Sequence, residues 1–243
     1  MPKNLNKKKV NTKDLPKQGG PNDAFAKLGT VTDPTDLIAQ QKKQYIEIYH
    51  VPSGRSVYFK AFLEMFEDQF SSEWEKTPVF GRMDPLVNFQ GTQRIMSLGW
   101  NIPSFGEEDA ERNLKKCSLL MSMLYPVYDT IDPDSPFTSA NTLISPPIFK
   151  LKMMNLITDT LGGSSSDTGV GSAKESGLLG VISGFTYAPV LDEGVIEKSG
   201  TFNLFPQTIK LQCEFTVLHT HELGWKTNQE PQIKKFPYKV DFE

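Results

Sequence analysis

The chain has 243 residues, a net charge of −3 and 38% aliphatic and aromatic residues, enough for one large domain or two small ones with part of the chain left outside the core. With 2 cysteines, nothing in the composition calls for an oxidising compartment. The longest mostly apolar run, residues 178–190, is too short for the roughly 20 residues that cross a bilayer. We therefore expect a soluble protein, made in the cytoplasm, with no membrane partner.

The N-terminal segment is basic. Residues 1–20 carry six lysines against one acid, Asp14, whereas the rest of the chain is acidic. This asymmetry predicts a basic, mostly disordered arm over residues 1–35 on a mildly acidic body. Two uses remain open for it: a solvated tail, or contacts of lysines with nucleic acid or an acidic partner, for which the candidates are Lys7, Lys8 and Lys9.

The first half of the body is predicted to be extended. Residues 36–48 fit either a helix or a strand, and residues 57–66 alternate in a way that favours a strand after the turn at 52–54. A turn at Asp84-Pro85 precedes a short predicted strand over residues 86–89. Residues 93–101 then alternate as a half-buried strand does.

A helix is predicted over about residues 105–125. Ser104 and Glu107 have the spacing of a capping box, and three acids occupy the first turn, where the helix dipole favours them. Pro126 ends the helix. One apolar stripe recurs at steps of three and four: Ala110, Leu114, Cys117, Met121, Leu124 and Tyr128.

The second half is predicted to be mainly β. Strands are expected over residues 148–157, 177–190 and 208–217, separated by loops at 132–145, 162–172 and 192–201. We expect one domain over residues 36–230 and a polar C-terminal tail over 231–243. The predicted fold class is mainly β (α+β), with antiparallel strands in a sandwich or barrel and one long amphipathic helix across it.

No catalytic, metal-binding or cofactor-binding residue emerges from the motifs. His219 and His221 would share a face of a strand, but no third ligand has a fitting spacing. The glycine-rich loop at 162–172 has its lysine misplaced for a phosphate cradle, and Ser183 is out of register with a nucleophile elbow. Cys117 and Cys213 fall on apolar faces and are expected to be buried. We therefore expect a protein that is not an enzyme.

Arg82 and Asp84 flank Met83 in the segment Gly81–Pro85. Side chains at this spacing point the same way on an extended chain, so an ion pair across a turn is plausible. Local stabilisation of the turn and a contact between subunits are the two interpretations of these residues.

Several segments together resemble structural proteins of tailed bacteriophages. The resemblance covers about residues 55–226, and the order of strand, amphipathic helix, strands and closing strand is similar to the tail-tube fold. The segments are 59–63, Asp68, Trp74, 79–85, 92–95, 108–111, 124–126, 146–147, 178–180, Pro206, 215–219 and 223–225.

The resemblance implies a β-sandwich or barrel of tail-tube type that forms a ring, expected to be sixfold, in a contractile phage tail. Strands of adjacent subunits would pair around a lumen through which DNA passes only transiently. The ring would belong to the tube or to its junction with the baseplate, and would contact other tube and baseplate proteins. Loops 132–145 and 162–172 would contact neighbouring rings. Candidate contacts between subunits are Trp74, Arg82, Asp84 and Trp225.

Two other functions stay open. A nucleic-acid-binding or head-completion virion protein would use the lysine-rich arm. A tail-associated cell-wall hydrolase would need a catalytic constellation, and the motifs supply none.

Overall fold

The fold is mainly β. The computed structural model describes residues 44–130, 141–161, 172–197 and 203–240, together with Ala39 and Lys42. From residue 44 onward the described residues contain two helices, α2 (Glu107–Met123) and α3 (Ala173–Ser176). The strands β1 to β9 are Tyr45–His50, Arg55–Lys60, Leu63–Thr77, Leu86–Pro103, Val127–Thr130, Asn141–Ser145, Phe149–Lys152, Leu178–Glu197 and Leu204–Val217.

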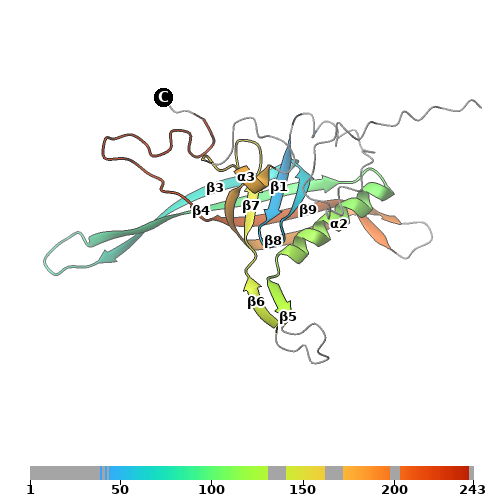
Figure 1. Ribbon diagram of the computed structural model, residues 1–243, viewed down its shortest axis with the longest axis horizontal. Coiled ribbons are helices and arrows are strands. Elements are labelled where there is room, and N and C mark those ends of the chain that lie inside the picture. Colours follow the sequence, from blue (N-terminus) through green and yellow to red (C-terminus); the bar gives the residue numbers. More distant parts are fainter. Residues whose placement is uncertain are drawn as a thin grey trace, which may run out of the picture.

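Seven strands form one antiparallel sheet in the order β2-β1-β7-β8-β9-β4-β3, and β5 and β6 form a separate hairpin (Figure 1). The prediction of a mainly β, antiparallel fold is thus confirmed. The described strands do not close into a barrel, because the sheet ends at β2 on one side and β3 on the other.

The two edge strands are consecutive in sequence, although they lie at opposite ends of the sheet order. Only residues 61 and 62 separate them. The amide of Ala61 donates to Gln44 O (3.1 Å) beside β1, while Phe62 O accepts from the amide of Asn101 (3.0 Å) in β4. The sheet therefore curls until its edges meet at this one corner. The predicted single strand over 57–66 is wrong at this point, because the chain changes layers there.

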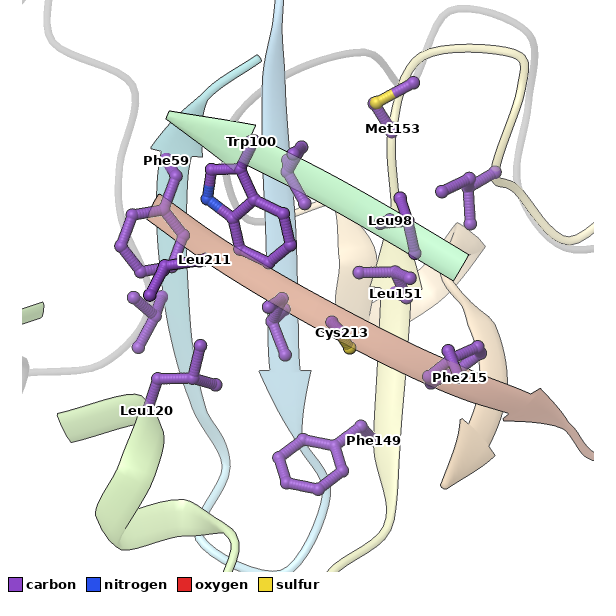
Figure 2. Close-up of a cluster of buried hydrophobic side chains, with 14 of the residues drawn as sticks. Phe59, Leu98, Trp100, Leu120, Phe149, Leu151, Met153, Leu211, Cys213 and Phe215 are labelled. Atoms are coloured by element: carbon purple, nitrogen blue, oxygen red, sulfur yellow. The ribbon is translucent and has the colours of Figure 1, made fainter. Parts of the chain in front are cut away.

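The core lies between two parts of the curled sheet. The long strands β8, β9, β4 and β3 form one layer, and β2, β1, β7 and α2 cover its inner face. Figure 2 shows Phe59, Trp100, Leu120 and Leu211 converging from four elements. The prediction for the cysteines is confirmed, since both are buried, free thiols. Alternation accounts for this layer, because every second residue of β9 from Ile209 to Val217 is buried.

Helix α2 confirms the helix predicted over about residues 105–125, but its N-cap and its buried face differ from the prediction. The N-cap residue is Gly106 and no side chain caps it; instead Asp109 Oδ2 accepts from the amide of Phe105 (3.2 Å). Ser104 is buried and its hydroxyl oxygen accepts a hydrogen bond from Asn113 (3.0 Å). The buried face of the helix is shifted from the predicted stripe, and only Ala110 and Cys117 belong to both. The buried residues of α2 are Asp109, Ala110, Asn113, Cys117, Leu120 and Met123.

Three hairpins project from the body (Figure 1). The longest consists of β3 and β4, which are continuous where a short strand over residues 86–89 was predicted. The β8–β9 hairpin includes residues 192–197, predicted to be a loop, and β6 occupies part of the predicted loop at 132–145. Strand β7 ends at Lys152, before the predicted end at 157. The outer parts of these strands were missed because apolar and polar residues do not alternate regularly along them.

Gly180 marks the point where β8 leaves β7. A Cβ at this position would lie 2.4 Å from Thr216 O and 2.5 Å from the Phe215 ring, so only glycine fits. Strand β8 pairs with β7 from Leu178 to Gly180 and with β9 from Gly180 onward, so from Val181 onward the described residues give it β9 alone as a partner.

Candidate assembly surface

The layer β8-β9-β4-β3 has two edges that no other described strand covers. Strand β3 pairs with β4 alone along its full length, and β8 pairs with β9 alone from Val181 to Glu197. An uncovered strand presents a row of backbone donors and acceptors that can bind another strand. The other end of the sheet, β2, has only 6 residues and lies beside α2. The open edges of β3 and β8 are thus the main pairing surfaces of the described chain.

These two edges extend in opposite directions. Strand β3 begins opposite Trp100 and runs beyond the level of β9, whose pairing with β4 stops at Ile95. Strand β8 runs the other way, beyond Thr208, to Glu197. The layer is therefore staggered, as a sheet must be if its strands are to tilt around a barrel.

The outer face of this layer is polar. From β9 it presents Lys210, Gln212 and Glu214, all exposed. Glu64 accepts a hydrogen bond from Asn101 and pairs with Lys210 (3.4 Å) on the same face. Further along β3 the register places two more acids, Glu67 and Glu73, opposite Ser97 and Gly91. Acidic side chains outnumber basic ones on this face.

Beyond the body, β3 and β4 continue as a two-stranded ribbon, which we define as residues 71–93 (Figure 1). One of its faces is apolar. Trp74 and Phe89 are paired in register, and their rings meet edge to face with centroids 5.2 Å apart. Their exposures are 51% and 56%. Trp74, predicted as a contact between subunits, is thus on an open surface.

The tip of the ribbon carries the other predicted contact residues. Arg82 and Asp84 are exposed, and the described residues provide neither side chain with a hydrogen bond or an ion pair. The turn is held by its backbone, where the amide of Arg82 donates to Val79 O (3.3 Å). Phe80 and Met83 beside them are fully exposed. The expected ion pair across the turn is therefore not formed in this structure.

The root of the ribbon holds a buried ion pair that motif reasoning missed. Arg94 Nε donates to Asp68 Oδ1 (2.9 Å) and Nη2 to Oδ2 (2.6 Å), and both side chains are at most 3% exposed. The guanidinium also lies over the rings of Phe70 (5.1 Å) and Phe236 (5.6 Å). The available signal was an arginine at an inward position of an alternating strand, which requires a buried partner.

The C-terminal strap, residues 218–240, closes over this root. Tyr238 donates its phenolic hydrogen to Asp68 Oδ2 (2.9 Å), and the Phe236 ring meets that of Phe70 edge to face at 6.1 Å. Burial, reinforced by this bond to Asp68, raises the pKa of Tyr238. Residues 231–240, separated from the domain in the sequence prediction, thus contact it directly.

Trp225 lies on the strap and is 71% exposed. It lines a hollow of about 230 Å³ whose walls are mainly apolar, a volume below the roughly 300–1,000 Å³ typical of ligand sites. The hollow is lined by Leu223, Gly224, Trp225, Pro231, Ile233 and Phe236. Trp225 therefore belongs to a second exposed apolar surface, next to the root of the ribbon.

The two histidines do not share a strand face, because β9 ends at Val217. Burial, followed by the charge of Arg94, lowers the pKa of His219. His221 lies within 3.2 Å of the Thr220 hydroxyl. Among the described residues, no three His, Cys, Asp or Glu side chains form a group that could hold a metal ion.

Several predicted contacts lie outside the described residues. They are Lys7, Lys8 and Lys9, loop 162–171 and most of loop 132–145. No helix of the described chain is long and apolar enough to cross a membrane. No protein-family model matches the chain, and no curated protein matches it significantly.

Proposed function

We propose that this protein is a non-enzymatic structural subunit of a phage tail, forming a ring of the tail tube or of the tube–baseplate junction. The observation that carries the proposal is the pair of open, staggered edges on β3 and β8. The order of segments that resembles tail proteins supports the same role. In this proposal, β3 of one copy pairs with residues 181–197 of β8 in the next.

The strand directions favour this pairing of β3 with β8 between copies. The layer contains four antiparallel strands, so its two edge strands, β8 and β3, run in opposite directions. When β3 of one copy is placed beside β8 of an identically oriented copy, the pair is antiparallel and the alternation continues. The contact is head to tail, and such a contact closes into a ring when the rotation permits. In a sixfold ring each copy would supply four strands to one barrel.

The polarity of the layer suits a lumen. Closing the ring with the core outside would turn the exposed side chains of Lys210, Gln212 and Glu214 inward, together with the acids of β3. An acidic, polar wall repels the phosphate backbone, so DNA would pass without being held. This accords with a transient rather than a specific contact with DNA.

Disulfide cross-linking tests the pairing of β3 with β8. Glu73→Cys on β3 would be combined in turn with Gly184→Cys, Thr186→Cys and Ala188→Cys on β8, and the full chain oxidised at concentrations where native mass spectrometry finds oligomers. We expect a ladder of covalent multimers that ends at the closed ring, strongest for one β8 position, because a disulfide needs Cβ atoms about 4 Å apart.

The control pairs Glu73→Cys with Lys115→Cys on α2, whose side chain is 55% exposed and lies on neither edge. The native thiols do not compete, since burial raises the pKa of both to about 12. A chain that stays monomeric, or multimers that form equally with the control pair, would reject edge pairing. A cryo-EM map of the particle that locates the chain outside the tail would reject the role in the tail.

A further inference from the structure

The ribbon has two chemically different faces. Cross-strand partners share a face, so the ring contact of Trp74 with Phe89 fixes one side as apolar. An irregularity between Glu73 and Trp74 leaves Gln90 outside the pairing and brings Phe89 opposite Trp74. On the other side, Gln90 Nε2 donates to Glu75 Oε2 (2.8 Å). The apolar side continues the core-facing side of β3, where Phe66 lies opposite Leu98.

A two-stranded ribbon is marginally stable in water unless a further element covers it. The strap covers this face at its root, where Phe236 meets Phe70. Further out, Trp74, Val87 and Phe89 are each about half exposed. The open part of the apolar face thus begins where the strap's contact ends.

A matching stripe lies along β8. Ile182, Phe185 and Tyr187 face the core, opposite Phe215, Cys213 and Leu211 of β9. An irregularity around Ser183 keeps Ile182 and Phe185 on one face. All three pack against the core but remain partly exposed, because among the described strands only β9 borders β8 there. The core is therefore incompletely covered beside the open edge of β8.

We propose that the ribbon of one copy completes the core of the next, with Trp74 and Phe89 packed against Ile182, Phe185 and Tyr187. This rests on the edge pairing proposed above. A continuous sheet keeps its core-facing side on the same side throughout, so pairing β3 with β8 aligns the two apolar stripes. If β3 of one copy pairs with residues 181–197 of the next along almost its whole length, Trp74 of the first copy lies opposite Phe185 of the second. The occupant of the ribbon's apolar face is thus a second copy of this chain.

A photo-cross-linking residue at position 89 tests the assignment. Phe89→p-benzoylphenylalanine in the full chain should, on irradiation of the oligomer, form cross-links that peptide mass spectrometry maps to residues 181–190 of another copy. The control is Asn88→p-benzoylphenylalanine, the neighbouring position on the polar face, which should give no cross-link to the Ile182, Phe185 and Tyr187 stripe. Cross-links from position 89 to the chain's own strap, or to any other surface, would overturn the proposal.

The outcome is separable from that of edge pairing. If the Glu73→Cys series forms its ladder while position 89 links elsewhere, the edges pair but the ribbon does not complete the neighbouring core. If no ladder forms, both proposals fail.

Truncation gives a second measurement. Phe89→Ala should weaken the association between copies by roughly tenfold or more, as removal of a central aromatic anchor does, while the monomer keeps its near-UV circular dichroism. Glu75→Ala, on the opposite face of the same ribbon, should change the association by less than about twofold. Equal association of Phe89→Ala and the unaltered chain, measured by analytical ultracentrifugation, would also overturn the proposal.

Discussion

The body and the ribbon are built from the same two strands, β3 and β4, but the side chains facing the core side are buried in the body and exposed in the ribbon. In the body, β4 pairs with β9 as well as with β3, and α2, β1 and β2 lie across the core from this layer. Trp100 is 1% exposed there. In the ribbon, the same two strands have only each other among the described residues, and Trp74 is 51% exposed. Strand pairing alone does not bury a side chain. Burial needs a second layer, which the described residues do not supply to the ribbon.

The first prediction compares the two tryptophans and has the largest expected effect. Trp100→Ala should lower the free energy of unfolding of the monomer by about 3–5 kcal/mol, because it leaves a large cavity in the core. Trp74→Ala should cost at most about 1 kcal/mol, the value of one exposed cross-strand pair. Chemical denaturation of both variants at a concentration that keeps the chain monomeric measures the difference. Similar losses would show that the ribbon is packed in the monomer.

The second prediction concerns the ion pair where body and ribbon meet. Arg94→Met should lower the free energy of unfolding by about 3 kcal/mol, because it leaves the carboxylate of Asp68 buried without its cation. The double variant Arg94→Met/Asp68→Leu should recover most of this loss, since no unpaired charge remains. Urea denaturation of the single and double variants checks this. A double variant as unstable as the single one would mean that the pair itself, with its hydrogen bonds, stabilises the junction.

The third prediction uses the thiols as markers of the intact body. Burial raises the pKa of Cys117 and Cys213 to about 12. The folded chain therefore keeps both protons at a pH where the unfolded chain has lost them, and alkaline pH favours unfolding. Between the ordinary thiol pKa of 9.0 and about 12, each thiol should therefore lower the free energy of unfolding as the pH rises. Below the ordinary thiol pKa this contribution is constant.

Denaturation curves of the unaltered chain and of Cys117→Ala/Cys213→Ala, measured across this pH range, isolate the effect. The variant should lose less stability per pH unit, since the tyrosines titrate in both proteins. Identical slopes would show that the thiols are not shielded from water.

The fourth prediction, with the smallest effect, concerns the strap. Tyr238→Phe removes the hydroxyl that donates to Asp68 and should lower the free energy of unfolding by about 1 kcal/mol. Hydrogen exchange should accelerate in residues 231–240 and stay unchanged in β9. Tyr49→Phe is the control, since it removes a tyrosine hydroxyl away from the strap. Unchanged exchange in the strap would mean that Phe236, not Tyr238, holds it.

Local sequence signals predicted the elements that are determined by patterns among neighbouring residues. Helix α2 was placed within two residues, because first-turn acids and Pro126 mark its ends. The inner half of β9 was recognised from alternation, since every second residue there is buried. Buried cysteines followed from their places on those two elements.

The candidate assembly surface could be predicted only in part. Trp74 and the 79–85 turn were singled out, but the length of the ribbon was not. Only Trp74 is apolar among residues 71–77 of β3, and the irregularity at Gln90 interrupts the alternation of β4, so no regular sequence pattern marks the ribbon. The buried contacts of Arg94 with Asp68 and Phe236 join residues far apart in sequence, and no spacing rule connects them. Residues 231–240 of the strap were assigned to a separate tail for the same reason.

The sequence by itself determined a mainly β chain with one long helix, because strand alternation and helix-end signals act over a few neighbouring residues. Tertiary structure alone decided which strands became edges, that β2 and β3 separate at residues 61–62, and that the strap closes over Arg94. Those outcomes depend on which backbone rows and side chains are left uncovered after the whole chain has packed, and no short segment contains that information.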